Sequence, residues 1–306
     1  MQESPRISSV KHDRKKKASY QTAKERAIER SRQLTLAAQD IGLIPPVVNP
    51  KRRSECEKSF RLFCETYFPN LFQMEWSDDH LRVIEKIERV VNHRETLAVA
   101  MPRGHGKTTL SLTAVLWAVL TGKHSFVYLL AAADGAAKKL LDNIKNQLSS
   151  NALLLEDFPE AVYPIVKLEN ESRRCIGQKY LGKPTYIQWG NHEVVFPTIP
   201  KSKCSGAVIR VSGLTGNFRG AMHIRPNGQS IRPTLVVADD PQTDTSARSA
   251  VQTAERLSIL NGTIIGLAGP GQRTGVIVTC TVIQEGDLSD QILNREKFPA
   301  WHGERT

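Results

Sequence analysis

Short apolar runs of strand type recur along the chain, separated by longer segments in which apolar residues have helical spacing. The helical pattern is clearest in residues 81–91, 110–120 and 134–148. The strand-like runs are residues 97–100, 125–131, 207–211, 234–238 and 275–282. Strands that alternate with helices are typical of a mostly parallel sheet covered on both faces, so we expect an α/β fold. A hairpin is also predicted, between residues 186–189 and 193–196, because Gly190 and Asn191 separate these two β-rich runs.

The stretch MPRGHGKTT, residues 101–109, joins the first strand-like run to a helical segment. Strand, glycine-rich turn and helix is the order that a phosphate-binding loop requires. Gly104 and Gly106 permit a backbone whose N–H groups point inward at an anion. Lys107 can reach the β- and γ-phosphates of a nucleotide, and the Thr108 hydroxyl can bind Mg²⁺. Met101 stands where the usual pattern has its first glycine, and a glycine turn with a surface lysine is the alternative interpretation.

Two carboxylates follow the apolar run at residues 235–238, namely Asp239 and Asp240. A parallel sheet binds ligands at the carboxyl ends of its strands, so Asp239 is expected near a metal held by Thr108. Asp240 is then placed to orient the water that attacks the γ-phosphate. The alternative is an Asp-Asp-Pro turn that only caps the strand. A third strand-like run ends in Thr279, Cys280 and Thr281, whose hydroxyls could sense a γ-phosphate, although threonine is ordinary in strands.

Positive charge is concentrated near the N-terminus. The 306 residues carry a net charge of +11, and residues 1–53 hold 13 Lys or Arg against 5 Asp or Glu. A basic arm of this kind commonly contacts nucleic acid or an acidic partner, with a flexible solubilising tail as the equal alternative. A helix is expected over residues 19–39.

The sequence has no apolar run of about 18 residues, so we expect no membrane span. Five scattered cysteines predict neither a zinc site nor a disulfide framework.

The chain resembles the ATPase half of a bacteriophage terminase large subunit, the motor that packages DNA into the capsid. The resemblance covers about residues 60–301. It is carried by residues 235–240, by Thr279-Cys280-Thr281, by the Arg-Gly stretch of residues 212–220, and by Pro102-Arg103-Gly104-His105-Gly106-Lys107-Thr108-Thr109. It implies a RecA-like P-loop ATPase that uses ATP and Mg²⁺ and forms a homo-oligomeric ring around double-stranded DNA. It also implies a portal protein and a small terminase subunit as partners, and a location in the bacterial host cytoplasm at the portal vertex of the procapsid.

The resemblance assigns roles by position. The loop at 102–109 binds the phosphates, Thr108 and Asp239 hold the metal, and Thr279-Cys280-Thr281 couples hydrolysis to movement. Asp240 stands where the family usually has a catalytic Glu, which is one methylene longer. Arg219 is a candidate arginine finger acting across a ring interface, or else a surface residue of its loop. Arg103 is a candidate for stabilising the γ-phosphate, or else a partner in a structural salt bridge.

The adenine site is expected near Trp76 and His80, which match the region where the family has a Gln-containing element. Ser77 is also a good N-cap for the helix at 81–91, and core packing is the alternative role of Trp76.

For the domain organisation, we expect a basic extension over residues 1–53, an ATPase domain over 54–290, and the start of a linker at 291–306. Terminases usually carry a nuclease domain after the ATPase, and no nuclease activity is expected of this chain. The remaining alternatives are another P-loop translocase or helicase-type ATPase, and a nucleotide-gated DNA-binding module.

Overall fold

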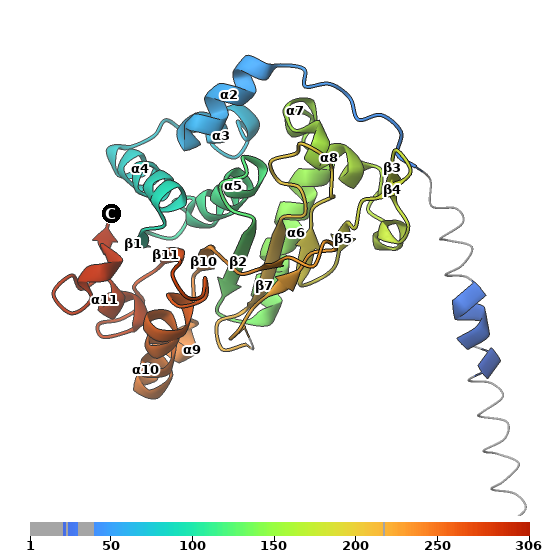
Figure 1. The fold of residues 1–306 in the computed structure, drawn as a ribbon. Coiled ribbons are helices and arrows are strands. Elements are labelled where there is room, and N and C mark those ends of the chain that lie inside the picture. The colour runs from blue at the N-terminus through green and yellow to red at the C-terminus, as the bar shows by residue number, and fades with distance from the viewer. Residues whose placement is uncertain (1–20, 23, 30–39, 217) are drawn as a thin grey trace, which may run out of the picture.

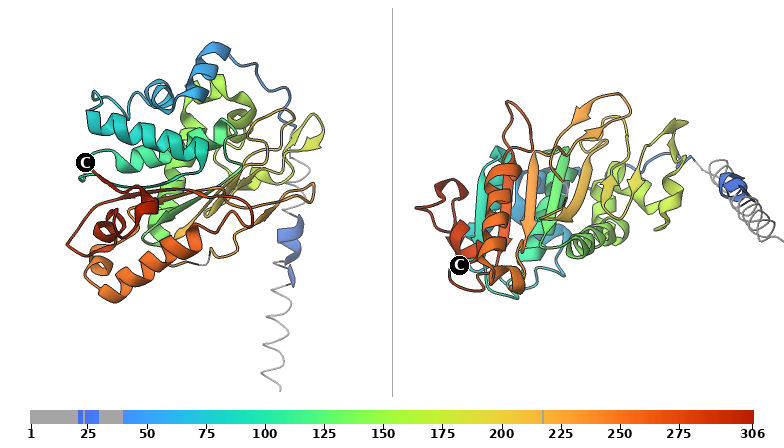
Figure 2. Two further views of the ribbon diagram at one scale, coloured as in Figure 1. Left: turned by 60° about the vertical axis from the view of Figure 1, so that its left-hand side comes forward. Right: turned by 90° about the horizontal axis from the view of Figure 1, so that it is seen from below.

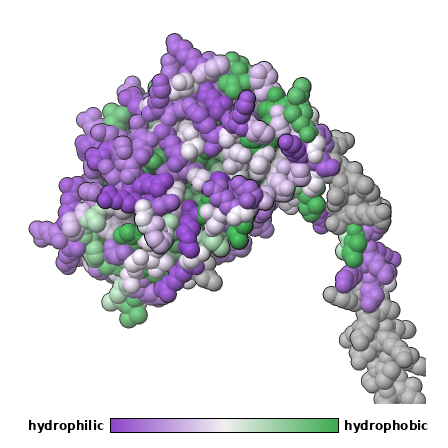
Figure 3. All heavy atoms as spheres, viewed as in Figure 1, coloured by the Kyte–Doolittle hydropathy of each residue, from purple (hydrophilic) through white to green (hydrophobic). Residues whose placement is uncertain are grey.

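The computed structural model describes residues 21–22, 24–29, 40–216 and 218–306. Residues 21–22 and 24–29 are helical and exposed, as the predicted helix over 19–39 requires at those positions. The rest of that helix and most of the predicted basic arm lie outside the described residues. Among the described residues, no helix combines the length and the apolar character needed to cross a bilayer. The face seen in Figure 3 is mostly hydrophilic, with small separate apolar areas.

The centre of the domain is an eight-stranded sheet with the order β12-β1-β11-β10-β2-β7-β6-β5 (Figure 1). Its six parallel strands are β1 (Thr96–Ala100), β2 (Phe126–Ala131), β7 (Val208–Gly213), β10 (Leu235–Asp239), β11 (Gly275–Cys280) and β12 (Glu304–Arg305). The predicted hairpin is confirmed as β5 (Gln188–Trp189) and β6 (Glu193–Val195), which joins the sheet antiparallel to β7. The expectation of a mostly parallel α/β sheet is thus confirmed.

Both faces of the sheet are covered, which explains why its strands are apolar throughout rather than alternating (Figure 2). Successive residues of β1 point to opposite faces, so Leu97 and Val99 belong to one core and Ala98 and Ala100 to the other. The first core lies under the helices α3 (Phe60–Tyr67), α4 (Asp78–His93), α5 (Lys107–Leu120), α6 (Asp134–Ser150) and α8 (Pro159–Val166). The second lies under α10 (Ala250–Ser258), the π-helical turn η2 (Ile259–Ile264), α11 (Leu288–Ile292) and η3 (Pro299–Trp301).

Small elements complete the domain. Two short helices, α7 (Ala152–Asp157) and α9 (Asp244–Ala247), and the 3-10 turn η1 (Ser172–Cys175) connect larger ones. Two small antiparallel pairs lie outside the central sheet, β3 (Lys179–Tyr180) with β4 (Lys183–Pro184) and β8 (His223–Ile224) with β9 (Ser230–Ile231).

The packed domain begins before residue 54. Helix α2 (Pro50–Lys58) crosses that position, and its Arg52 donates to the buried Asp157 at 2.6 Å. Arg53 forms an ion pair with Glu160 at 2.5 Å. Upstream, Asp40 accepts a hydrogen bond from the Leu181 amide at 3.1 Å. Because these contacts reach residues more than 100 positions away, residues 40–53 form part of the domain rather than of a separate arm.

Residues 291–306 also pack on the domain instead of leading away from it as a linker. Strand β12 adds to the sheet beside β1, and the Thr306 amide donates to the Ala100 carbonyl at 3.1 Å. Trp301 is only 1% exposed and donates to Asn261 at 2.6 Å. Burial of an indole of this size anchors the segment, so the domain continues past residue 290.

Candidate nucleotide site

The glycine-rich loop, the two aspartates and the threonine motif lie together at the carboxyl ends of three central strands. Strand β11 lies between β1 and β10, with Ala100 opposite Cys280 and Thr279 opposite Asp239. Since all three strands are parallel, the glycine-rich loop, the two aspartates and the threonine motif follow their carboxyl ends. After β1 the chain crosses through α5 to β2, and after β11 it crosses through α11 to β12 on the other side. Ligands of open α/β sheets bind where connections diverge in this way.

The loop before α5 has the backbone that its glycines predict. Gly104 and Gly106 have φ angles of 85° and 74°, in the left-handed region that other residues avoid. Gly106 is the N-cap of α5 and provides no side-chain hydrogen bond, so the first N–H groups of this 14-residue helix remain available to a ligand. This geometry supports an anion site.

Lys107 lies along the loop rather than in solvent. Its side chain is 6% exposed, and Nζ donates to the carbonyls of Met101 at 2.9 Å and Pro102 at 3.2 Å. An ammonium group has three donors, so one remains for a phosphate oxygen. The ammonium is therefore held beside the helix N-terminus, where it adds to the positive potential of the loop.

Asp239 lies at the centre of a hydroxyl network. Its Oδ2 accepts from Thr108 at 2.8 Å and its Oδ1 accepts from Thr279 at 2.7 Å. Ser111 lies 2.9 Å from the Thr279 hydroxyl on the far side. Asp239 is 6% exposed, and this burial raises the pKa of its carboxyl because desolvation disfavours the charge more than the two hydroxyls favour it. The network connects the loop, the acidic strand and β11.

Substituting Asp239→Asn is expected to stabilise the protein at neutral pH and so to raise its Tm. The raised pKa means that the charged carboxylate costs the folded state free energy above that pKa, and an amide removes this cost. The gain should shrink as the pH falls towards the ordinary pKa of aspartate, because the carboxyl is then neutral in both states. Thermal unfolding at about pH 7 and about pH 4 measures this, with Asp142→Asn on the exposed side of α6 as the matched control. A lower Tm at neutral pH would contradict the prediction.

Asp240 has a different environment from its neighbour. It leaves the strand with φ +39°, its amide donates to the Thr279 carbonyl at 2.8 Å, and its carboxylate accepts from Thr281 at 3.3 Å. Asp240 is half-buried. Asp is one of the few residues that tolerate the left-handed region, and strained positions cluster at functional sites. Each aspartate therefore accepts a hydrogen bond from a different threonine. Asp239 accepts from Thr279 in β11, and Asp240 accepts from Thr281 just after that strand.

The two candidate arginines are both exposed. Arg103 forms an ion pair with Asp244 at 3.4 Å, and both side chains are mostly open to solvent. Arg219 follows Phe218, a buried ring 5.9 Å from that of Tyr128, in the loop after β7. Among the described residues Arg219 forms no ion pair. Neither arginine is buried in the core, and Arg103 would have to exchange its contact with Asp244 for one with an added ligand.

The structure brings His80 to the glycine-rich loop. Its Nε2 lies 3.2 Å from the His105 carbonyl, and the two imidazole rings are stacked 6.2 Å apart. Ser77 caps α4, as predicted, and also contacts the other ring nitrogen of His80 at 2.7 Å. Trp76 packs between Phe72 and His80, with ring centroids 5.0 Å and 5.9 Å away, and donates to Glu65 at 2.8 Å. His80 is therefore nearer to the loop than Trp76.

A buried polar cluster behind the aspartates was not predicted. Gln242 Nε2 lies within 3.0 Å of the Thr281 carbonyl, Asp287 Oδ2 and Ser289 Oγ. The fully buried Asp287 also accepts from the Ile283 amide at 2.7 Å. This cluster joins the loop after β10 to the loop after β11. Asp287 is the N-cap of α11, and the preference of aspartate for that position is the signal that could have revealed it.

Arg256 is a second buried group that the sequence pattern does not predict. It is 8% exposed, its Nη1 donates to the Pro241 carbonyl at 2.9 Å, and its Nε has no partner among the described residues. Burial lowers the pKa of its guanidinium. The side chain fixes the backbone directly after Asp240.

No protein-family model matches the chain, and the search of curated proteins gave no significant match.

Proposed function

We propose that this chain is a RecA-like P-loop ATPase, the motor subunit that moves double-stranded DNA into a viral procapsid. The observation that carries the proposal is Asp239, held between the hydroxyls of Thr108 and Thr279 beside the glycine-rich loop. The packaging role, with a portal protein, a small terminase subunit and a ring of identical subunits as partners, rests on the resemblance to terminase large subunits.

The residues present fit a magnesium nucleotide. Mg²⁺ prefers oxygen ligands and is usually bound by one or two protein side chains together with substrate phosphates and water. Thr108 and Asp239 offer a hydroxyl and a carboxylate in contact with each other. No cluster of three or more His, Cys, Asp or Glu side chains suited to a metal occurs in the described part of the chain. When bound, Mg²⁺ would neutralise charge on the β- and γ-phosphates.

The chain's own residues would perform the remaining steps. Loop N–H groups and Lys107 bind the phosphates, and Asp240 orients a water molecule and accepts its proton. The water oxygen forms a bond to the γ-phosphorus while the bond to the β–γ bridging oxygen breaks, which gives ADP and phosphate. Thr279 and Thr281 each donate a hydrogen bond to one aspartate. A shift of either carboxylate would therefore move β11 or the residues that follow it. In a ring, Arg219 would approach the nucleotide of a neighbouring subunit.

A steady-state ATPase assay with and without duplex DNA tests the proposal. We expect Mg²⁺-dependent release of phosphate that increases when duplex DNA is added. Hydrolysis stimulated by single-stranded DNA instead would favour a helicase-type ATPase. Tight ATP binding with no turnover in either condition would favour a nucleotide-gated DNA-binding module.

Removing residues 1–39 should weaken binding to duplex DNA and flatten its salt dependence if the basic arm contacts DNA. The cut is placed before Asp40 because residues 40–53 pack on the domain. Each lost phosphate contact lowers the slope of log K against log salt by about 0.9. Fluorescence anisotropy across a salt series measures the slope, and an unchanged slope would identify the arm as a tail or a protein-docking segment.

A further inference from the structure

A second region of the molecule has a strongly biased charge. Residues 172–232 contain ten Lys or Arg and a single acidic residue, Glu193. Arg210 pairs with that glutamate, so the one negative charge is already neutralised. Among the ten cations, Arg174 and Lys203 are also paired, with Glu169 and Glu57. The remaining seven form no ion pair within the part of the chain that the structure describes.

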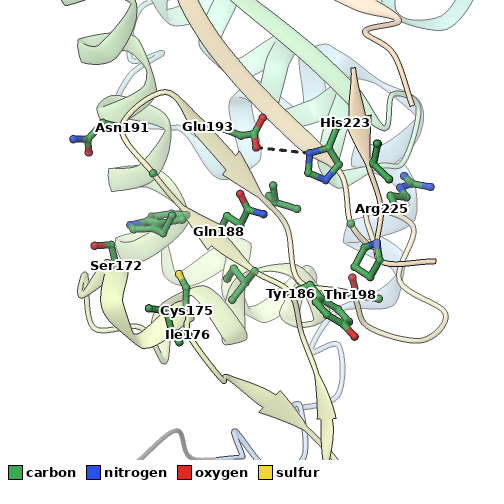
Figure 4. Close-up of a pocket in the computed structure, with 17 residues that line it drawn as sticks. Ser172, Cys175, Ile176, Tyr186, Gln188, Asn191, Glu193, Thr198, His223 and Arg225 are labelled. Atoms are coloured by element: carbon green, nitrogen blue, oxygen red, sulfur yellow. Dashed lines mark ion pairs between the residues drawn. The ribbon is translucent and has the colours of Figure 1, made fainter. Parts of the chain in front are cut away.

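This segment builds the edge of the sheet furthest from β12, and its surface there is hollowed. One hollow of about 800 Å³ lies between η1, the β5–β6 hairpin and the β8 strand (Figure 4). Glu193 and His223 lie in contact on one side of it, with His223 Nδ1 3.7 Å from Glu193 Oε1, and Tyr186 and Thr198 lie together at one end. A second hollow of about 580 Å³ also has Tyr186 and Thr198 in its lining. Because they share these residues, the two hollows are adjacent, and together we call them the basic groove.

Unpaired cations line both parts of the basic groove. Arg225 lines the first hollow, and Lys183 and Lys201 line the second. Both lysines are exposed, whereas Arg225 is half-buried and its Nε has no hydrogen-bond partner among the described residues. The Nη1 of Arg225 donates to Gln229 at 3.1 Å, and the guanidinium has no acidic partner among the described residues. Cations that line a concave, low-dielectric surface attract anions more strongly than the same charges on a flat one.

We propose that the basic groove binds the phosphate backbone of double-stranded DNA, separately from the nucleotide site and from the N-terminal arm. The choice of duplex rests on the proposed function, and the polyanionic ligand rests on the charge and shape of the groove. Sites for single strands usually present several exposed rings on which bases stack. In this groove Tyr186 is the only exposed aromatic ring among the described lining residues, since Trp189 is buried and Tyr180 is half-buried. That composition suits a backbone better than unstacked bases.

The test is a triple variant of the full chain, Lys183→Gln, Lys201→Gln and Arg225→Gln. Its matched control removes three exposed cations away from the groove, Lys58→Gln, Lys139→Gln and Lys297→Gln. Anisotropy with a duplex oligonucleotide is measured without nucleotide across a salt series, and thermal unfolding checks that both variants fold. We expect the groove variant to lose about tenfold or more in affinity at 0.1 M salt and up to about 2.7 in salt slope, with the control clearly less affected.

The outcomes separate the groove from the ATPase proposal. Equal losses in the two triple variants, or no loss in the groove variant, would overturn the inference and leave the exposed Ile176, Leu181 and Ile224 as the mark of a protein partner's surface. Tighter binding of single-stranded DNA that is abolished by Tyr186→Ala would also overturn it. Normal ATP turnover without DNA, together with loss of the stimulation by duplex, in a groove variant that no longer binds duplex would support both proposals. A chain that lacks ATPase activity but binds duplex through the groove would overturn only the proposed function.

Discussion

Replacing Lys107 by alanine is expected to lower ATP turnover by about 10²- to 10³-fold while leaving the protein folded. Among the described residues, the ammonium is the side-chain cation that the structure fixes beside the helix N-terminus. Removing a single preorganised donor to transition-state charge has effects of this size. The two hydrogen bonds that the change removes are each worth about 1.5–3 kcal/mol because the donor is charged. The fold should survive, since both bonds hold loop carbonyls rather than the packed core.

The measurement is kcat at saturating Mg²⁺ and ATP, with thermal unfolding to confirm the fold. Lys297→Ala, an exposed lysine far along the chain, is the control and should behave as the unmodified protein does. Turnover near the unmodified value in the Lys107→Ala protein would remove the basis for a phosphate-binding loop at residues 102–109.

Asp240→Asn is expected to leave ATP affinity nearly intact and to lower kcat by about 10²- to 10⁴-fold, the usual contribution of a general base. The amide cannot accept a proton from water, yet Asn tolerates the left-handed backbone at this position as well as Asp does. The substitution therefore separates chemistry from backbone strain.

Asp240→Glu should retain activity, because a longer carboxylate can still accept the proton after a small shift of the water. Its backbone preference is poorer, so we expect a loss of stability of about 1 kcal/mol. Asp142→Asn is the control for loss of a surface charge. Normal hydrolysis by Asp240→Asn would reduce Asp240 to a turn residue, and Asp244 and Glu285 would be the next acids to test as the base.

The central strands could be predicted because a strand that is buried on both faces is an uninterrupted run of apolar residues. Residues 97–100 and 235–238 are of this kind, and both are strands within one residue of their expected limits. The glycine-rich loop was equally visible, since Gly104 and Gly106 are needed for a backbone that few other residues adopt. The structure then places Thr108 and Asp239 in contact although 131 positions separate them.

Other features left little trace in the sequence. Strand β12 has only two residues and no apolar run, and it is recognisable only through its pairing with β1. Gln242 and Asp287 are ordinary polar residues until folding buries them against each other. The basic groove was hidden for a different reason. The charge of residues 54–306 sums to a small value, and that sum conceals a segment in which cations outnumber acids ten to one.

The pairing of β12 with β1 has a mechanical consequence. The Thr306 amide donates to the carbonyl of Ala100, the last residue of β1. Met101 follows Ala100 in the chain, and its carbonyl accepts a hydrogen bond from the Lys107 ammonium. Glu304 in the same strand is bonded to Lys86 of α4, so the strand is tied to the helical layer as well. A tension applied along residues 304–306 would load the β12–β1 pairing in shear, parallel to the strands. It would then act on Ala100, which directly precedes the residue whose carbonyl accepts from Lys107. The strand that leads into the loop is in this way also the strand through which a pull on the last residues enters the domain.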